Sequence, residues 1–333
     1  MSSVPLSFSC WDYDRVRAVQ DGRVVPQGVS LTFLPNAPEE TFFRMLRYRE
    51  FDVAEMSLSS YVLSLFDDEP PFVAIPVFPS RVFRHGSIYL SPGSEVTDPA
   101  QLSGATIGVP EYQMTASVWI RGTLSDQHGL PAESVRYRTG GLHDAGRKEK
   151  LRLDLPDRFD VRPIEAHETL DELLSGNRID ALYTARAPRS YDPADTGPGR
   201  VRRLFPDSRR VEQDYFRATG IFPIMHTVVI RREVHEQHPW VARSLLDALT
   251  AARDAVYPQL HEVTALKAML PWSVTEAEET VDLMGPDFWP YGIEPNRTTL
   301  ETFLRYSHEQ GLAKRLLTPE ELFVPETHEG VLI

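Results

Sequence analysis

Two arginines and a histidine lie within five residues of one another in the segment SRVFRHGS: Arg81, Arg84 and His85. An arginine guanidinium is planar and binds a carboxylate through two parallel hydrogen bonds. A histidine imidazole gains or loses a proton near neutral pH. The segment therefore predicts a site where arginines hold an organic anion and His85 acts as an acid or base. The alternative for each arginine is an ion pair with a surface Asp or Glu.

A second histidine and a glutamate are further candidates for proton transfer. His226 lies in FPIMHTVVI, and Glu55 follows the apolar segment FDVA. Ligands bind at the carboxyl ends of strands in open α/β sheets, so Glu55 is expected to accept a hydrogen bond from a phenol or to relay a proton. The alternatives are a histidine hydrogen-bonded in the core and a glutamate that caps a helix or pairs with an arginine.

Residues expected to contact the ligand follow three predicted strands. Trp11 offers an aromatic face that suits a flat substrate. Free backbone N–H groups at the start of a helix favour an anion, and such a helix is predicted to begin at Gln113. Core packing is the alternative for Trp11, and simple N-capping is the alternative for Thr115. The substrate-binding candidates are Trp11, Asp12, Ser57, Ser60, Gln113, Met114 and Thr115.

The sequence carries no recognised cofactor or metal motif. It lacks a G-x-G-x-x-G segment after a strand and a G-x-x-x-x-G-K segment, which disfavours nucleotide cofactors. The histidines of HEQH are three residues apart and do not match the zinc-protease pattern H-E-x-x-H. None of the lysines lies in a segment expected near the ligand, which disfavours pyridoxal phosphate. These are Lys148, Lys150, Lys267 and Lys314. We therefore expect neither a cofactor nor a metal.

Length, charge and the first residues restrict the class of protein further. At about 150 residues per domain, a chain of 333 residues predicts two domains. The formal net charge of −13 repels a phosphate backbone, so nucleic acid is not an expected partner. No run of about 18 apolar residues predicts a membrane span. The opening residues lack the pattern of a secretory signal, which predicts a cytoplasmic location. Homo-oligomer formation is left open.

Expected strands and helices alternate along the chain. The expected strands show short apolar runs or alternation, and the expected helices show apolar residues at helical spacing. A loop of small residues is expected after residue 57, and helices are expected to dominate after residue 234. The expected strands are 6–13, 29–35, 51–57, 72–78, 87–91 and 106–109, and the expected helices include 39–49, 113–128, 266–270, 277–285 and 300–310. The order predicts an α/β protein with helices on a largely parallel sheet.

Two segments of the sequence share one design. FFRMLRYREFDVAEMS and ETLDELLSGNRIDALYTA each combine an amphipathic helix, a short polar turn, an aspartate and a strand. The two aspartates are Asp52 and Asp180. This internal echo predicts two lobes of similar construction.

Two such lobes, together with the segment LSGATIGV at residues 102–109, resemble the type II periplasmic-binding-protein fold. In that fold the chain crosses between the lobes twice, and the ligand lies in the cleft between them. The resemblance implies that residues 1–95 and 225–333 form lobe one and that residues 96–224 form lobe two. It also implies that His85 and His226 lie beside the two crossovers.

Five longer segments resemble the 4,5-dihydroxyphthalate decarboxylase family: EFDVAEMSLSSY, AIPVFPSRVFRH, GVPEYQMTASVWIRG, GIFPIMHTVVI and MGPDFWPYGIEPNR. They span about residue 48 to about residue 297. The resemblance implies a cofactor-independent carboxy-lyase of aromatic compound catabolism, which converts a dihydroxylated phthalate to protocatechuate. Its partner is then a small aromatic carboxylate.

This resemblance also implies roles for the candidate residues. His85 or His226 donates the proton, with Glu55 in reserve, while Arg81 and Arg84 hold the carboxylate that is retained. Two other functions stay open from the sequence. One is a solute-binding protein for a small organic anion. The other is a different lyase or dehydratase reaction on a cyclic carboxylic acid.

Overall fold

The computed structural model describes residues 3–328 and divides them into two compact units. Unit 1 comprises residues 3–81, 224–301 and 317–328, and unit 2 comprises residues 82–223 and 302–316. The first boundary therefore follows residue 81, where the sequence placed it at residue 95. Residues 82–95 lie in unit 2 because β5 (Ile88–Leu90) pairs with β9 (Ala181–Tyr183).

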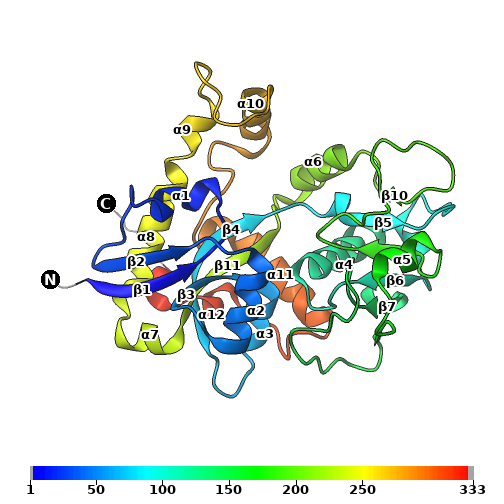
Figure 1. Cartoon of the computed structure of the whole chain (residues 1–333), viewed down its shortest axis with the longest axis horizontal. Helices are drawn as coiled ribbons and strands as arrows, with labels where there is room; N and C mark the ends of the chain where they lie inside the picture. Colours follow the sequence, from blue (N-terminus) through cyan, green and yellow to red (C-terminus); the bar gives the residue numbers. More distant parts are fainter. Residues whose placement is uncertain (1–2, 329–333) are drawn as a thin grey trace. The chain divides into compact units, whose positions relative to one another are not determined.

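Unit 1 is built on a five-stranded mixed sheet (Figure 1). Its strands are β1 (Val4–Ser9), β2 (Val29–Leu34), β3 (Val53–Ser57), β4 (Phe72–Arg81) and β11 (Ile224–Arg231), in the order β2-β1-β3-β11-β4. β1 is parallel to β2 and β3, whereas β11 is antiparallel to β3 and β4. The carboxyl ends of β3 and β4 and the amino end of β11 therefore meet at one edge, where His226 is paired with Ser57.

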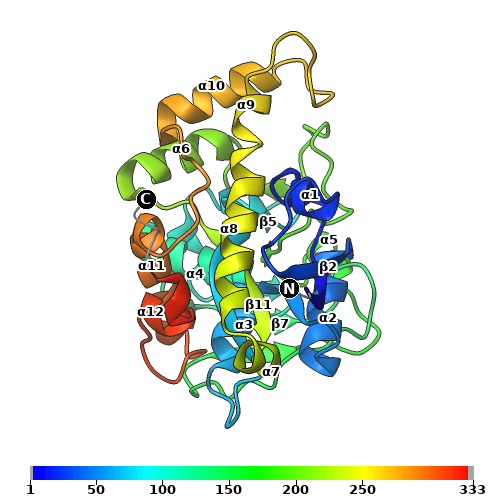
Figure 2. The ribbon, with the colours of Figure 1, turned by 90° about the vertical axis from the view of Figure 1, so that its left-hand side faces the viewer.

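Helices cover this sheet and bury their apolar faces on it. In α8 (Trp240–Asp254), Val241, Leu245, Leu249 and Ala252 are buried at helical spacing. This face of α8 packs on β4 and on α1 (Asp14–Gln20), and the pair of helices is visible in Figure 2. The remaining helices of unit 1 are α2 (Pro38–Tyr48), α3 (Leu58–Ser64), α7 (Arg232–Gln237), α9 (Tyr257–Leu260), α10 (Ser273–Met284) and α12 (Pro319–Leu322).

Unit 2 contains a six-stranded sheet in the order β10-β5-β9-β6-β7-β8. The strands not yet given are β6 (Thr106–Val109), β7 (Arg136–Thr139), β8 (Asp160–Pro163) and β10 (Arg202–Arg203). β6, β7, β8 and β9 are parallel, and β5 and β10 extend the sheet in antiparallel fashion. Its helices include α4 (Thr115–His128), α5 (Leu170–Ser175) and α6 (Ser208–Thr219).

Residues 302–316 belong to unit 2 because the second half of α11 (Arg297–Glu309) packs on α4. The ring of Tyr306 lies 2.1 Å from the position that a Cβ atom on Gly122 would occupy. Only glycine at this place in α4 permits the close approach. One turn away, the rings of Trp119 and Phe303 have their centroids 5.5 Å apart. The sequence analysis placed residues 302–316 in lobe one, because packing between helices that are distant along the chain leaves no pattern in the local sequence.

The echo between Asp52 and Asp180 has a structural basis in both units. Asp52 Oδ2 accepts a hydrogen bond of 2.8 Å from the backbone N–H of Ser7 on β1. Asp180 Oδ2 accepts one of 2.7 Å from the backbone N–H of Thr106 at the start of β6. Each aspartate therefore joins the start of its own strand to the neighbouring strand in the same way.

Four local expectations differ from the structure. The first strand ends at Ser9, and α1 begins soon after it. The expected loop after residue 57 is helix α3. The Ser57 hydroxyl caps it by accepting the Ser60 N–H, and most of its side chains, among them Leu58, Tyr61 and Val62, are buried. Residues 266–270 are not helical. Both sheets are mixed because antiparallel strands enter each of them.

Within residues 3–328, no helix has the length and apolar character needed to cross a membrane.

Candidate functional site

A glutamate at the centre of unit 1 receives four hydrogen-bond donors. The Glu55 side chain on β3 is fully buried. Its Oε1 atom accepts hydrogen bonds from His226 Nδ1 at 2.6 Å and from the Tyr13 hydroxyl at 2.7 Å. Its Oε2 atom accepts from the Trp11 backbone N–H at 3.1 Å and from the Cys10 thiol at 3.6 Å. A carboxylate saturated in this way is held in one orientation.

The sheet brings these groups together from distant parts of the sequence. Cys10, Trp11 and Tyr13 directly follow β1, and β1 is paired with β3 in parallel. His226 enters from β11, which lies antiparallel on the other side of β3. The strand order β1-β3-β11 therefore positions Glu55 between the donor groups of its two neighbours.

The electrostatics of the cluster favour an ionised Glu55. Burial pushes the pKa of Glu55 upward, but the charge of His226 and the hydrogen bonds from His226 and Tyr13 outweigh it, so the net pKa is lowered. Burial, followed by the Glu55 charge, raises the pKa of the Tyr13 phenol and that of the Cys10 thiol. Tyr13 therefore stays a hydrogen-bond donor, and Cys10 stays a thiol and not a nucleophilic thiolate.

His226 presents one ring nitrogen away from this carboxylate. Nδ1 points to Glu55, which fixes the proton of the neutral ring on that nitrogen and leaves Nε2 for a partner outside the cluster. The Phe42 ring packs edge-on against the imidazole with the centroids 4.9 Å apart. The His226 side chain is 17% exposed, whereas Glu55 is 0% exposed. His226 is therefore the member of the pair that can reach a small molecule.

An arginine that the sequence reasoning did not single out lies in the same cluster. The Arg15 guanidinium carbon is 4.2 Å from the ring centroid of Tyr13 and 4.2 Å from that of Trp289. Its Nε atom donates to the Pro79 carbonyl at 2.6 Å, and Nη1 contacts Asp14 at 3.1 Å. Sandwiching between two rings holds the cation in place. The sequence gives only a weak indication of this role for Arg15, namely that the aromatic residues Trp11 and Tyr13 follow a predicted strand.

The predicted binding residues of unit 1 differ in their surroundings. Trp11 is 43% exposed and so is not a core residue. Asp12 is exposed and pairs with Arg17 at 3.1 Å. Ser57 and Ser60 are buried, and the Ser57 hydroxyl accepts the Ser60 backbone N–H at the start of α3. Trp11 therefore fits a contact with a flat ligand, while the hydrogen bond between the serines fits a capping role.

Arg81 is turned toward its own unit. Its Nη2 atom donates to the Pro290 carbonyl at 2.7 Å and also to the Asn296 side-chain oxygen. Burial lowers the pKa of Arg81 to about 9. These contacts anchor the segment before α11. They favour a structural role for Arg81, and its contact with substrate stays a prediction.

Arg84 and His85 lie in unit 2, beside a cavity of about 10 Å³ that is also lined by Trp119. Such a volume holds about one water molecule, whereas small-molecule sites are typically about 300–1,000 Å³. Burial lowers the pKa of Arg84 to about 10, although the charge of Glu212 opposes that shift. This cavity is too small for an aromatic dicarboxylate.

His85 is poorly placed to act as a cationic acid. Burial, followed by the charge of His128, lowers the pKa of His85 to about 4, so the ring is neutral at pH 7. Its Nδ1 atom is buried without a hydrogen bond within residues 3–328, and it lies 4.0 Å from Glu212. The Tyr215 and Phe205 rings surround it. The geometry favours the structural alternative for His85.

Gln113, Met114 and Thr115 lie at the start of α4, as the sequence predicted to within two residues. Gln113 Nε2 donates to the buried Glu111 at 2.8 Å. Met114 occupies the N-cap position, and the Thr115 side chain is buried. The carboxylate beside this helix start is itself paired with Arg147 and Lys150. Contact of the three helix-start residues with substrate stays a prediction. Within the described residues, no three His, Cys, Asp or Glu side chains are grouped closely enough to hold a metal ion.

Solved structures of similar fold include binding proteins. A periplasmic sulfonate-binding protein from Methylobacillus flagellatus matches with a TM-score of 0.52 at 12% identity, over 98% of this chain and 93% of that chain. The periplasmic aliphatic sulphonate binding protein from Escherichia coli matches with a TM-score of 0.50 at 13% identity, over 97% of each chain. The predicted periplasmic-binding-protein-like α/β fold is thus confirmed.

Sequence comparison identifies closer relatives. A 4,5-dihydroxyphthalate decarboxylase from Comamonas testosteroni is 38% identical over 333 residues, which are 100% of this chain and 100% of that protein. Another from Pseudomonas putida is 40% identical over 218 residues, which are 66% of this chain and 83% of that protein. No protein-family model matches the chain. Because the identity extends over the full length of both proteins in the first comparison, the chain belongs to the 4,5-dihydroxyphthalate decarboxylase family.

Proposed function

We propose that this protein is a carboxy-lyase that converts 4,5-dihydroxyphthalate to protocatechuate and carbon dioxide in the breakdown of phthalates. The observation that carries the proposal is the 38% identity to a protein of that name over the whole of both chains. The Glu55–His226 pair supports it because the reaction needs a held acid and the pair offers one at the edge of a sheet.

The chemistry of the substrate defines what the protein must supply. Each carboxylate of 4,5-dihydroxyphthalate is para to a hydroxyl group, which pushes electron density toward the carbon that carries the carboxylate. Protonation of that carbon forms a new C–H bond. The C–C bond to the carboxylate then breaks, its electron pair returns to the ring, and carbon dioxide leaves. The protein must therefore deliver one proton to carbon and hold the other carboxylate.

Unit 1 contains groups suited to both tasks. With both ring nitrogens protonated, His226 delivers the Nε2 proton to the ring carbon of the substrate and is left neutral, with its Nδ1–H held by Glu55. Glu55 is a positioning residue that also stabilises the imidazolium charge, and Tyr13 fixes Glu55 in turn. Arg15, stacked between two rings, is the cation of this cluster that is suited to a carboxylate.

Turnover without an added cofactor is the direct test of this function. Purified protein, dialysed against a chelator, is incubated with 4,5-dihydroxyphthalate, and carbon dioxide and protocatechuate are followed by mass spectrometry. We expect equal amounts of the two products, at many turnovers per protein molecule. Stoichiometric binding with no product would instead favour the solute-binding alternative. A panel of other hydroxylated aromatic and cyclic acids in the same assay tests the alternative of a different lyase reaction.

Replacing His85 by Gln should leave turnover within about threefold of wild type, because a buried neutral imidazole with a pKa of about 4 supplies no proton at pH 7. The measurement is kcat at saturating 4,5-dihydroxyphthalate, together with the melting temperature to confirm folding. A large loss of kcat in a variant that is folded would return the donor role to His85.

The cytoplasmic location also stays a prediction, which cell fractionation tests.

A further inference from the structure

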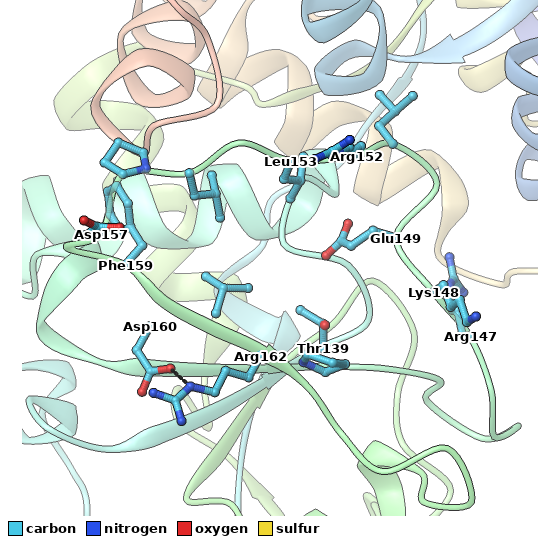
Figure 3. Close-up of a pocket in the computed structure, with 15 residues that line it drawn as sticks. Thr139, Arg147, Lys148, Glu149, Arg152, Leu153, Asp157, Phe159, Asp160 and Arg162 are labelled. Atoms are coloured by element: carbon cyan, nitrogen blue, oxygen red, sulfur yellow. Dashed lines mark ion pairs between the residues drawn. The ribbon is translucent and has the colours of Figure 1, made fainter.

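A pocket of about 790 Å³ in unit 2 shares no residue with the Glu55–His226 cluster. One wall is the loop between β7 and β8, residues 140–159, which contains neither helix nor strand (Figure 3). Loops of more than about 15 residues without secondary structure are uncommon in compact domains and often bind ligands. The volume is in the range of about 300–1,000 Å³ that is typical of small-molecule sites.

Buried ion pairs hold this loop in place. Glu111, which is 1% exposed, accepts hydrogen bonds from Arg147 Nη2 at 2.6 Å and from Lys150 Nζ at 2.5 Å. The positive charges outweigh the effect of burial and lower the pKa of Glu111. Because Arg147 and Lys150 are engaged with this carboxylate, the wall that they carry is fixed before any ligand arrives.

Two further cations of the loop have no such partner. Lys148 and Arg152 line the pocket, and neither forms an ion pair with a described residue. On the other side Arg162 is paired with Asp160 at 2.8 Å, shown as a dashed line in Figure 3. Lys148 and Arg152 are therefore cations that no described carboxylate pairs with directly, while Asp157, which also lines the pocket, offsets part of their charge.

The same pocket contains a carboxyl group with unused hydrogen-bonding capacity. Glu149 Oε1 accepts the Tyr112 backbone N–H at 2.5 Å, whereas Oε2 is buried without a hydrogen-bond partner within the described residues. Figure 3 shows the Glu149 carboxyl pointing toward the middle of the lining side chains. A buried polar atom left without a partner is costly, so a ligand hydroxyl that bonds to Oε2 would recover that cost.

The protonation of Glu149 suits such a hydroxyl. The pKa of Glu149 is raised to about 7. Burial makes the largest contribution to this rise, and the negative charge of Glu111 adds to it. The Tyr112 N–H and the charges of Arg121 and Lys150 oppose it. Both protonation states are populated near pH 7, and the group can donate to a phenol oxygen or accept from a phenol hydroxyl.

Apolar side chains complete the lining. Leu151, Leu153 and Leu155 extend along the loop, and Phe159 and Val161 lie at the start of β8. We propose that this pocket is a second binding site of the protein, for a hydroxylated aromatic carboxylate, with Arg152 and Lys148 on the carboxylate and Glu149 on a ring hydroxyl. The choice of a dihydroxylated probe rests on the proposed function, since protocatechuate is its product, whereas the charge and the apolar lining are independent of that function.

Calorimetry with protocatechuate tests the site. Arg152→Ala should raise the Kd of this binding event at least tenfold or remove the event. The matched control Arg189→Ala changes an exposed arginine of unit 2 that does not line the pocket, and should leave the isotherm unchanged. Hydrogen exchange locates the ligand, because protocatechuate should protect amides of residues 140–159 in wild type and not in Arg152→Ala.

The hydroxyl contact has its own test. Wild type should bind protocatechuate at least tenfold more tightly than benzoate at this site, and Glu149→Ala should remove most of the difference, while Glu149→Gln should keep much of it. Unchanged isotherms in both Arg152→Ala and Lys148→Ala, with no protection of residues 140–159, would overturn the proposal. If protocatechuate binds here but 4,5-dihydroxyphthalate gives no carbon dioxide, the pocket is established and the proposed function is not.

Discussion

Replacing His226 by Gln lowers kcat for 4,5-dihydroxyphthalate by at least about 100-fold, because general acid catalysis contributes about 10² to 10⁴ in rate. Gln keeps much of the shape of histidine and can still donate a hydrogen bond to Glu55, but it cannot carry a transferable proton. Substrate affinity changes much less, since the role assigned to His226 is proton delivery. Single-turnover kinetics and equilibrium binding measure the two quantities separately.

A matched control shows whether the loss of kcat is specific to position 226. His261→Gln makes the same chemical change at an exposed position of unit 1 and should leave kcat unchanged. If His226→Gln keeps turnover within a few fold of wild type while it is folded, the proton comes from another group or from water. The mechanism proposed for the Glu55–His226 pair would then be wrong, although the family assignment would stand.

The sequence identified both members of this pair but not their contact. Glu55 was predicted from its place at the end of an apolar strand, and His226 from its residue type and from the family resemblance. They are separated by 171 positions along the chain, and the direct 2.6 Å contact requires β11 to enter the sheet antiparallel beside β3. Nothing in the periodicity of FPIMHTVVI shows which strand will be its neighbour.

The arginine cluster shows the opposite case. Arg81, Arg84 and His85 are adjacent in sequence, which made them the most prominent cationic group. In the structure the unit boundary falls between Arg81 and Arg84, and Arg81 donates to Pro290 and Asn296 in its own unit. Arg84 and His85 line one small cavity of unit 2, and a shared role of all three groups in binding substrate stays a prediction. Arg15 is sandwiched between the ring of Tyr13, two residues away, and that of Trp289, which is distant in the sequence, so the local sequence does not show the sandwich.

Replacing Glu55 by Gln should reduce kcat by about 10- to 100-fold. The reason is that the protonated His226 ring loses the neighbouring negative charge. Tyr13→Phe keeps this charge and removes one hydrogen bond to it, so its effect should be smaller. The matched control is Glu236→Gln, an exposed position of unit 1, which should match wild type. Equal kcat in wild type and in folded Glu55→Gln would contradict the positioning role.

The same variant should also be less stable, and the pH dependence of that loss has a defined sign. Four donors converge on two carboxylate oxygens, and an amide has only one oxygen, so at least one buried donor loses its acceptor at a cost of about 1–3 kcal/mol. Because the folded state lowers the pKa of Glu55, its ionisation stabilises the fold above the ordinary carboxyl pKa. That contribution is lost as the pH falls through the lowered pKa of the folded protein. Urea unfolding from pH 7 to pH 3 should therefore show the largest gap between wild type and Glu55→Gln at pH 7, and a narrower gap in acid, because the unfolded wild-type chain takes up a proton at Glu55 below the ordinary carboxyl pKa while the folded chain resists it. A gap that is constant over this range would mean that the charge of Glu55 does not stabilise the fold.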